Sequence, residues 1–254
     1  MHTIVLATQK GGSGKSTLCI GLALAAIADG HTVRLIETDT LGTLSNWQSR
    51  RSFAEPLVEP IYCAPDLEPR LRELEQSGVT LTIIDTAAGI SAVTTTAIGA
   101  ADLCLIPSRP SVADIEATAS TLGAIRAFDK SFAFVLNQTP IRGQRIQSAA
   151  NGLVGDDAAD LSGIVAQPYI VMRNDHQDAL GAGLAVTEFA PAGKSADEIR
   201  GLWQWVAVKL DVAVVTDLQS LCSELETSPD LVPGLAPDSW LPTQADAEAA
   251  VQVS

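Results

Sequence analysis

The fold is decided by the stretch Lys10-Gly11-Gly12-Ser13-Gly14-Lys15-Ser16-Thr17. Residues 3–8 before it are apolar and β-branched, as in a buried strand, and residues 16–28 after it have the small apolar side chains of a helix that ends near Gly30. Glycines let the backbone curl so that its N–H groups point inward, and the positive end of the following helix adds to the attraction for an anion. The stretch therefore predicts a phosphate-binding loop between a strand and a helix.

The residues of this loop predict a site for a nucleoside triphosphate and Mg²⁺. We expect Lys15 to reach the β- and γ-phosphates and the Ser16 hydroxyl to ligate Mg²⁺. Further contacts to the nucleotide are expected from Gly11, Gly12, Ser13, Gly14 and Thr17. The structural alternative is a glycine-rich turn with a chance lysine. A dinucleotide fingerprint fails, because Thr17 stands at the third glycine position.

The rest of the chain alternates between apolar runs and longer helical stretches. Strands are expected at residues 3–8, 32–36, 81–85, 103–107 and 132–137, with shorter candidates at 164–165 and 185–186. Helices are expected at residues 16–28, 67–76, 91–99, 112–128, 145–153 and 196–210. Continuous apolar strands imply burial on both faces. The pattern predicts a doubly wound α/β fold of the P-loop NTPase type, in which a mostly parallel sheet has helices on both faces.

Charge divides the chain into two parts. The net charge is −14, and after Lys209 there are eight acidic residues and no Lys or Arg. Four prolines interrupt the same stretch, at positions 229, 233, 237 and 242. We therefore expect one ATPase domain over residues 1–210 and an acidic, partly disordered tail over 211–254 with a short helix near 217–226.

Composition also bears on the compartment and on possible ligands. No apolar run approaches the roughly 18 residues of a membrane span, and no leader is evident, so we expect a cytoplasmic protein. The four cysteines show no metal or disulfide spacing; they are Cys19, Cys63, Cys104 and Cys222. The acidic balance argues against a broadly basic nucleic-acid surface, although residues 1–209 leave room for a local one.

A second lysine makes the loop unusual. Gln9 stands where the common P-loop pattern has its first glycine, and the pattern present is K-G-G-x-G-K-[ST] with Lys10 at its start. Lys15 is sufficient within one chain, so Lys10 is free to reach phosphate held by a second subunit. Here the sequence resembles the ParA/MinD family of ATPases, and within it the small ParA-type partitioning ATPases. The resemblance implies a homodimer that closes on ATP, with Lys10 acting across its interface.

Two further segments carry the resemblance. Residues 36–47 are similar to the family's D-x-D-P-Q-x-x-x-x-x-W segment, with Glu37 at the first aspartate and Thr40-Leu41 replacing Pro-Gln. Asp39 takes the position of the aspartate that orients the attacking water; the alternative is a loop residue that caps a helix. The buried run 81–85 ends in Asp85, which is expected beside the Mg²⁺ held by Ser16 unless it merely ends a strand.

The base and DNA contacts rest on the resemblance. Asn137 takes the position that pairs with adenine in the family, and a carboxamide has the donor and acceptor for that purpose. A turn-forming asparagine is the alternative. Arg173 takes the position of an arginine implicated in DNA contact. Further basic residues able to supplement it are Arg142, Arg145, Lys194 and Arg200.

Three functions remain open after the sequence is read. The first is a partitioning ATPase that binds DNA nonspecifically, associates with the nucleoid and is switched off by a ParB-like or other activating partner. The second is a positioning ATPase with a protein cargo. The third is a P-loop metabolic enzyme, although His2, His31 and His176 form no evident acid–base site. No membrane partner is expected, because the tail is acidic rather than basic.

Overall fold

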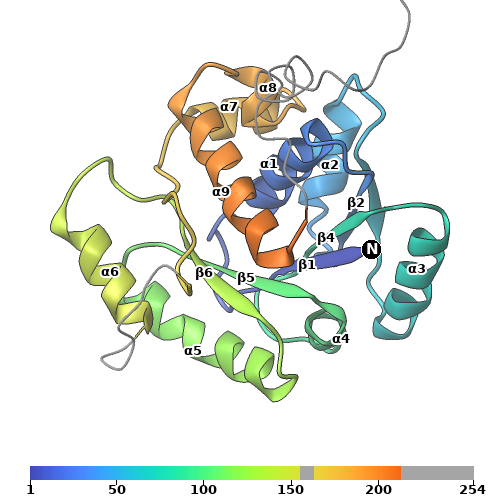
Figure 1. Ribbon diagram of the computed structural model, residues 1–254, viewed down its shortest axis with the longest axis horizontal. Coiled ribbons are helices and arrows are strands. Elements are labelled where there is room, and N and C mark those ends of the chain that lie inside the picture. Colours follow the sequence, from blue (N-terminus) through green and yellow to red (C-terminus); the bar gives the residue numbers. More distant parts are fainter. Residues whose placement is uncertain (155–162, 213–254) are drawn as a thin grey trace, which may run out of the picture. The chain divides into compact units, whose positions relative to one another are not determined.

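A parallel sheet forms the centre of the computed structural model, which describes residues 1–154 and 163–212. Its strands follow the order β3-β2-β4-β1-β5-β6 (Figure 1). Their bounds are β1 His2–Leu6, β2 Val33–Glu37, β3 Leu57–Pro60, β4 Leu81–Asp85, β5 Leu103–Ser108 and β6 Phe132–Leu136. All the pairings are parallel, which confirms the predicted fold class.

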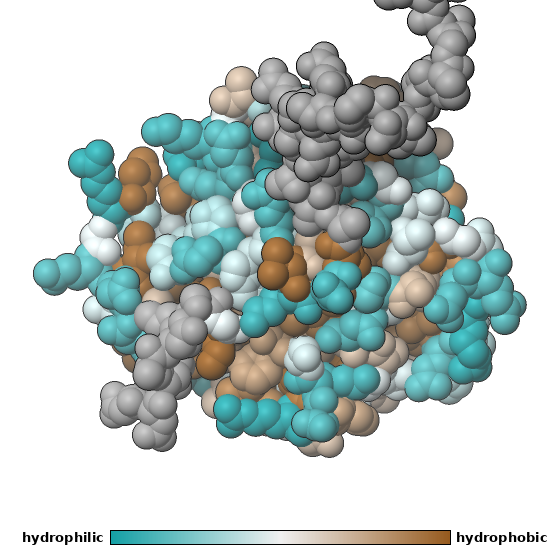
Figure 2. All heavy atoms as spheres, in the orientation of Figure 1, coloured by the Kyte–Doolittle hydropathy of each residue, from teal (hydrophilic) through white to brown (hydrophobic). Residues whose placement is uncertain are grey.

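Helices cover both faces of this sheet. Helices of one face are α1 Lys15–Ala28, α2 Thr43–Arg50, α7 Asp175–Gly181, α8 Val186–Phe189 and α9 Lys194–Leu210. Helices of the other face are α3 Ala64–Gln76, α4 Ala92–Ala100, α5 Val112–Ala127 and α6 Gln144–Val154. Within the described residues, no helix has both the length and the apolar character needed to cross a bilayer. On the face drawn in Figure 2, hydrophilic and hydrophobic residues are intermixed over the described part.

Strand side chains alternate between the two layers of the core. On β1, Ile4 and Leu6 pack in the layer that contains α1 and α9, whereas Val5 packs in the layer that contains α3 and α4. This is the period of two that a strand imposes. Because both faces are covered, β1 has no polar face, which explains its continuous apolar sequence.

The short elements are where the structure departs from the sequence expectations. The expected strand at 164–165 is reduced to a single parallel bridge between Val165 and Phe134. The expected strand at 185–186 is wrong, because Ala185 is the cap of α8 and Val186 is its first residue. A run of two apolar residues does not distinguish a strand from a helix end. The expectations also missed β3, which lies at the sheet edge, and the polar helices α2 and α7.

The described chain ends shortly after the closing helix. Helix α9 ends at Leu210, followed by its cap Asp211. Residues 213–254, with the expected helix near 217–226, lie outside the described residues, so the division at 210/211 stays a prediction.

The topology indicates that a ligand binds at the edge of the sheet formed by the carboxyl ends of its strands. From β1 the strand order runs outward to β4, β2 and β3 on one side and to β5 and β6 on the other. In an open parallel sheet, ligands bind beyond the carboxyl ends of the strands where the winding reverses. The loop after β1 lies at that point.

Helix α9 packs closely against α1, and a substitution at this contact can test the packing. A Cβ on Gly21 of α1 would lie 3.1 Å from Ile199 of α9, which is fully buried. We expect Ile199→Ala to lower the free energy of unfolding by about 2 to 5 kcal/mol, because a cavity opens between the helices. Urea denaturation is the measurement. Val208→Ala on the same helix, 77% exposed, should change it by less than about 0.5 kcal/mol. Equal losses in the two variants would contradict this packing.

Candidate functional site

The loop between β1 and α1 has the backbone conformation that its glycines predict. Gly12 and Gly14 have φ values of 72° and 91°, in the left-handed region that disfavours other residues. A Cβ on Gly14 would also clash with Nδ2 of Asn137. Gly14 is therefore required both by its φ angle and by the approach of Asn137. The Ser13 hydroxyl is buried and has no hydrogen-bond partner in the described residues.

The two lysines of the loop have different surroundings. Lys15 is the first residue of α1 and is 7% exposed. Lys10 is partly exposed and forms no ion pair within the described part of the chain. Burial raises the pKa of Asp114, but hydrogen bonds from Ser111 and Arg109 and the charges of Arg109 and Lys10 bring it below its ordinary value. Lys10 thus lies near the start of α5, at the rim of the loop.

Ser16 and Asp85 form the polar centre of the site. The Ser16 hydroxyl donates to Oδ2 of Asp85 over 2.5 Å, and Oδ1 of Asp85 is buried without a partner in the described residues. Burial raises the pKa of Asp85 to about 7, opposed by the Ser16 hydrogen bond and by Lys15 and reinforced by the charges of Glu37 and Asp39. A buried carboxylate with an unused oxygen calls for a positively charged partner.

The hydroxyl oxygen of Ser16 and the carboxylate oxygens of Asp85 fit Mg²⁺. The ion prefers oxygen ligands and is bound by one or two protein groups together with phosphate oxygens and water. Ser16 and Asp85 supply that small set, and the described residues contain no cluster of three or more His, Cys, Asp or Glu that could hold a metal alone.

Threonines join the ends of the central strands at this site. Thr38 donates from its backbone N–H and its hydroxyl to the carbonyl of Asp85, over 2.9 and 3.2 Å. The Thr86 hydroxyl donates to the carbonyl of Leu6 over 2.8 Å. The carbonyl of Thr8 accepts from the N–H of Gly89 over 3.2 Å. The sequence analysis did not identify Thr38 or Thr86, although each directly follows a strand that ends in an acidic residue.

Glu37 caps a helix in this structure. Its carboxylate is fully buried and accepts from the N–H of Leu44 over 2.6 Å and from the N–H and hydroxyl of Ser45 over 3.2 and 2.5 Å. These donors belong to the first turn of α2, where backbone N–H groups lack partners within the helix. The longer side chain that replaces the family's aspartate therefore positions α2.

Asp39 lies in the turn before α2 and is partly exposed. Its Oδ1 accepts from the N–H of Leu41 over 3.0 Å, which closes a local turn. Its charge contributes to the raised pKa of Asp85, so the two carboxylates share one site. The role of Asp39 in orienting water stays a prediction.

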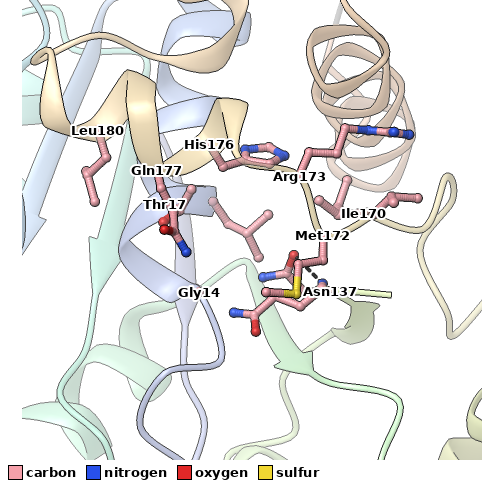
Figure 3. A pocket seen from close by; sticks show the side chains of 12 residues that line it. Gly14, Thr17, Asn137, Ile170, Met172, Arg173, His176, Gln177 and Leu180 are labelled. Atoms are coloured by element: carbon pink, nitrogen blue, oxygen red, sulfur yellow. Dashed lines mark hydrogen bonds between the residues drawn. The ribbon is translucent and has the colours of Figure 1, made fainter. Parts of the chain in front are cut away.

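A cavity of about 120 Å³ adjoins the loop at Gly14 and Thr17 (Figure 3). Asn137 lies in its wall and is 6% exposed. Its Nδ2 donates to the carbonyl of Ser13 over 2.7 Å, and its Oδ1 accepts from the N–H of Gln138 over 2.9 Å. Asn137 is thus brought to the predicted site, with both ends of its amide engaged there. Its contact with adenine stays a prediction.

Arg173 lies in the wall of the same cavity. Its Nη2 is 2.5 Å from Oε1 of Glu198 on α9, and Glu198 also accepts from the N–H of Val171 over 3.0 Å. In Figure 3 the guanidinium extends away from Asn137. The side chain is 20% exposed. The structure thus gives Arg173 an ionic partner that the sequence did not predict, and its contact with DNA stays a prediction.

The other basic candidates lie on different elements. Arg142 precedes α6, Arg145 lies in α6, and Lys194 and Arg200 belong to α9. Arg200 pairs with Asp197 over 3.0 Å. Sequence reasoning also missed the cavity residues Gln138 and Gln177. Gln138 directly follows Asn137, whereas no sequence pattern marks Gln177.

Known proteins match this chain over different lengths. The family profile described as VirC1 protein matches residues 1–142. Protein virC1 of Rhizobium radiobacter is 32% identical over 127 residues, covering 48% of this chain and 54% of that protein. The chain thus spans about half the length of this relative. The maintenance of carboxysome distribution protein A of Halothiobacillus neapolitanus is 27% identical over 205 residues, covering 78% of this chain and 92% of that protein.

Solved structures share the fold. The septum site-determining protein MinD of Pyrococcus horikoshii, complexed with Mg-ADP, matches with a TM-score of 0.63 and 16% identity, covering 82% of this chain and 98% of that one. Because the VirC1 profile covers more than half of the chain and the whole phosphate site, the chain belongs to the VirC1 family, within the ParA/MinD-type P-loop ATPases.

Proposed function

We propose that this chain hydrolyses ATP slowly with Mg²⁺ and closes with a second copy around two nucleotides. The observation that carries the proposal is the contrast between the two lysines: Lys15 is buried at the start of α1, whereas Lys10 is partly exposed at the rim without an ion-pair partner in the described residues. This contrast supports a contact of Lys15 with the chain's own phosphates and a contact of Lys10 with phosphate held by the second copy.

The remaining residues have roles that follow from their positions. Bound Mg²⁺ would neutralise negative charge on the β- and γ-phosphates. Ser16 and Asp85 would hold the ion, and the loop N–H groups with Lys15 would bind the phosphates. Asp39 would leave its turn with Leu41 and orient the attacking water. Lys10 of one copy would bind phosphate in the other.

The cycle would drive partition of DNA. We propose that the ATP-bound dimer binds DNA nonspecifically, so that it associates with the nucleoid in the cytoplasm. A ParB-like or other activating partner would then stimulate hydrolysis, which would release the dimer from the DNA. The cargo would be a plasmid or chromosome. A protein cargo is the second candidate, and the carboxysome-distribution relative favours it because that relative covers 78% of this chain.

Three substitutions separate the steps of this cycle. Lys15→Ala should weaken ATP binding by about tenfold or more, because it removes a charged contact to phosphate. Lys10→Ala should bind ATP and remain monomeric. Asp39→Ala should accumulate as an ATP-bound dimer with little turnover. Nucleotide titration, light scattering and phosphate release measure the three properties.

The matched control for the lysines is Lys130→Ala, at the opposite edge of the sheet before β6. It should leave all three properties unchanged. An Asp39→Ala protein that stays monomeric in ATP would overturn the dimer mechanism.

The raised pKa of Asp85 has a consequence for stability without nucleotide and Mg²⁺. Because the folded-state pKa is about 7 against an ordinary 3.8, ionisation costs more in the folded chain, and the free energy of unfolding falls as pH rises through this window. Asp85→Asn should gain about 2 to 3 kcal/mol over wild type between about pH 5 and about pH 8. Urea denaturation at both pH values measures it, and Glu116→Gln, at an exposed carboxylate on α5, is the control. A pH-independent difference would contradict the assigned pKa.

DNA binding is tested with a matched pair of variants. Wild type should retard nonspecific duplex DNA with ATP at low salt and release it as salt rises. Arg173→Gln should weaken binding and lower the salt slope by about one, because a phosphate contact is lost. Glu198→Gln breaks the same ion pair but keeps the positive charge, so it should not weaken binding. Absence of ATP-dependent retardation of wild type at low salt would exclude DNA as the partner.

A further inference from the structure

Most arginines of this chain are engaged with other groups of the described residues. Seven of the eleven form ion pairs with Asp or Glu. Arg50 donates to the carbonyl of Leu180, and Arg126 lies over the ring of Phe132. The two that remain are Arg142 and Arg145, which are exposed and form no ion pair or hydrogen bond with another described residue. Their charges are therefore available to a ligand.

Arg145 lies in the wall of an open groove of about 460 Å³ between the starts of α5 and α6, which lie side by side (Figure 1). Gln144 and Ser148 line the groove from α6, and neither side chain forms a hydrogen bond to another described residue. Arg142 directly precedes this wall, two residues before α6 begins. Arginine, amide and hydroxyl groups are the side chains that contact the phosphates of a DNA backbone.

This part of the chain is basic although the whole chain is acidic. Residues 103–154, from the start of β5 to the end of α6, contain five basic and three acidic residues, a net charge of +2, whereas the chain carries −14. Of the three acidic residues, Asp114 is paired with Arg109 and is 7% exposed, and Asp129 follows the far end of α5. Only Glu116 remains as an exposed carboxylate of this segment near the start of α5. The groove thus has a local excess of positive charge.

The groove lies at the same edge of the sheet as the phosphate loop. Helices α5 and α6 both begin beyond the carboxyl ends of the strands that precede them, β5 and β6. The charge of Lys10 helps to lower the pKa of Asp114 in the first turn of α5, so the loop and the start of α5 are close. Closure of two copies across Lys10 would bring both grooves to one interface. A ligand that contacts both grooves would therefore bind more tightly with ATP.

We propose that the groove between α5 and α6 binds the phosphate backbone of duplex DNA, with Arg142 and Arg145 as its phosphate contacts. The inference rests on the proposed DNA-binding ATPase and adds a surface to the contact at Arg173. A backbone of repeated phosphates matches two unpaired arginines that lie three residues apart. Each arginine that neutralises a phosphate releases condensed cations, so binding weakens as salt rises.

The test is the salt dependence of binding to a labelled nonspecific duplex, measured by fluorescence anisotropy on the full chain with ATP and Mg²⁺. Combining Arg142→Gln with Arg145→Gln should lower the slope of log affinity against log salt by about two if one copy contacts the duplex, and by about four if both do. Combining Arg142→Lys with Arg145→Lys keeps both charges and should keep the slope.

The matched control removes the same charge from the other end of α5. It combines Arg126→Gln with Lys130→Gln. Arg126 lies about 20 Å along α5 from Val112, which is beyond the roughly 10 Å over which exposed charges interact at about 0.1 M salt. This control should keep the wild-type slope.

The outcomes separate the inference from the function beneath it. A double glutamine variant that keeps the wild-type slope would overturn the inference and leave an acidic protein segment as the match for the groove. A double glutamine variant that light scattering shows to be monomeric in ATP would assign the groove to the second copy and would also overturn it. A wild-type chain that binds no DNA with ATP at low salt would overturn the proposed DNA binding, and the inference with it.

Discussion

The hydrogen bond from Ser16 to Asp85 is the contact around which the site is arranged. It joins the first turn of α1 to the last residue of β4, two elements that lie far apart in the sequence. The carboxylate is buried at the cost of a pKa raised to about 7, and one of its oxygens has no partner in the described residues. Burying a charge in this way is unfavourable for the unliganded fold. A cation bound at the free oxygen would offset this cost.

The neighbouring strand ends are held so that this centre is rigid. Thr38 bonds the carbonyl of Asp85, and Thr86 bonds that of Leu6, so the ends of β2, β4 and β1 are fixed together. Glu37 at the end of β2 fixes α2 through three hydrogen bonds. An aspartate at this position would be one methylene shorter. The departure from the family pattern at Glu37 is therefore explained by helix capping within this chain.

The fold and the site could be predicted from the sequence where the pattern that indicates them lies in consecutive residues. The strand, loop and helix at residues 3–28 and the strand ending in Asp85 were predictable, because burial on both faces and the spacing of glycines and lysines are written in consecutive residues. Strand β3 was not predictable, because it is a short edge strand that Pro56 precedes and that ends in Pro60. The partners of Arg173 and Asn137 depend on α9 and on the loop, which are distant in sequence. No pattern of neighbouring residues encodes such contacts.

Helix α2 connects the turn that contains Asp39 with the segment around α8, which belong to separate sequence motifs. At its start, Glu37 fixes it next to Asp39; at its end, Arg51 forms two hydrogen bonds of 2.7 Å with Glu188 of α8 and stacks 5.0 Å from the ring of Trp47. Trp47 in turn donates to the carbonyl of Leu184, just before α8. The Arg51 side chain is only 2% exposed, so removing Glu188 would leave a buried positive charge without its partner. Since α7 and α8 are in contact, helix α2 is bonded to the segment that lines the cavity beside the phosphate loop.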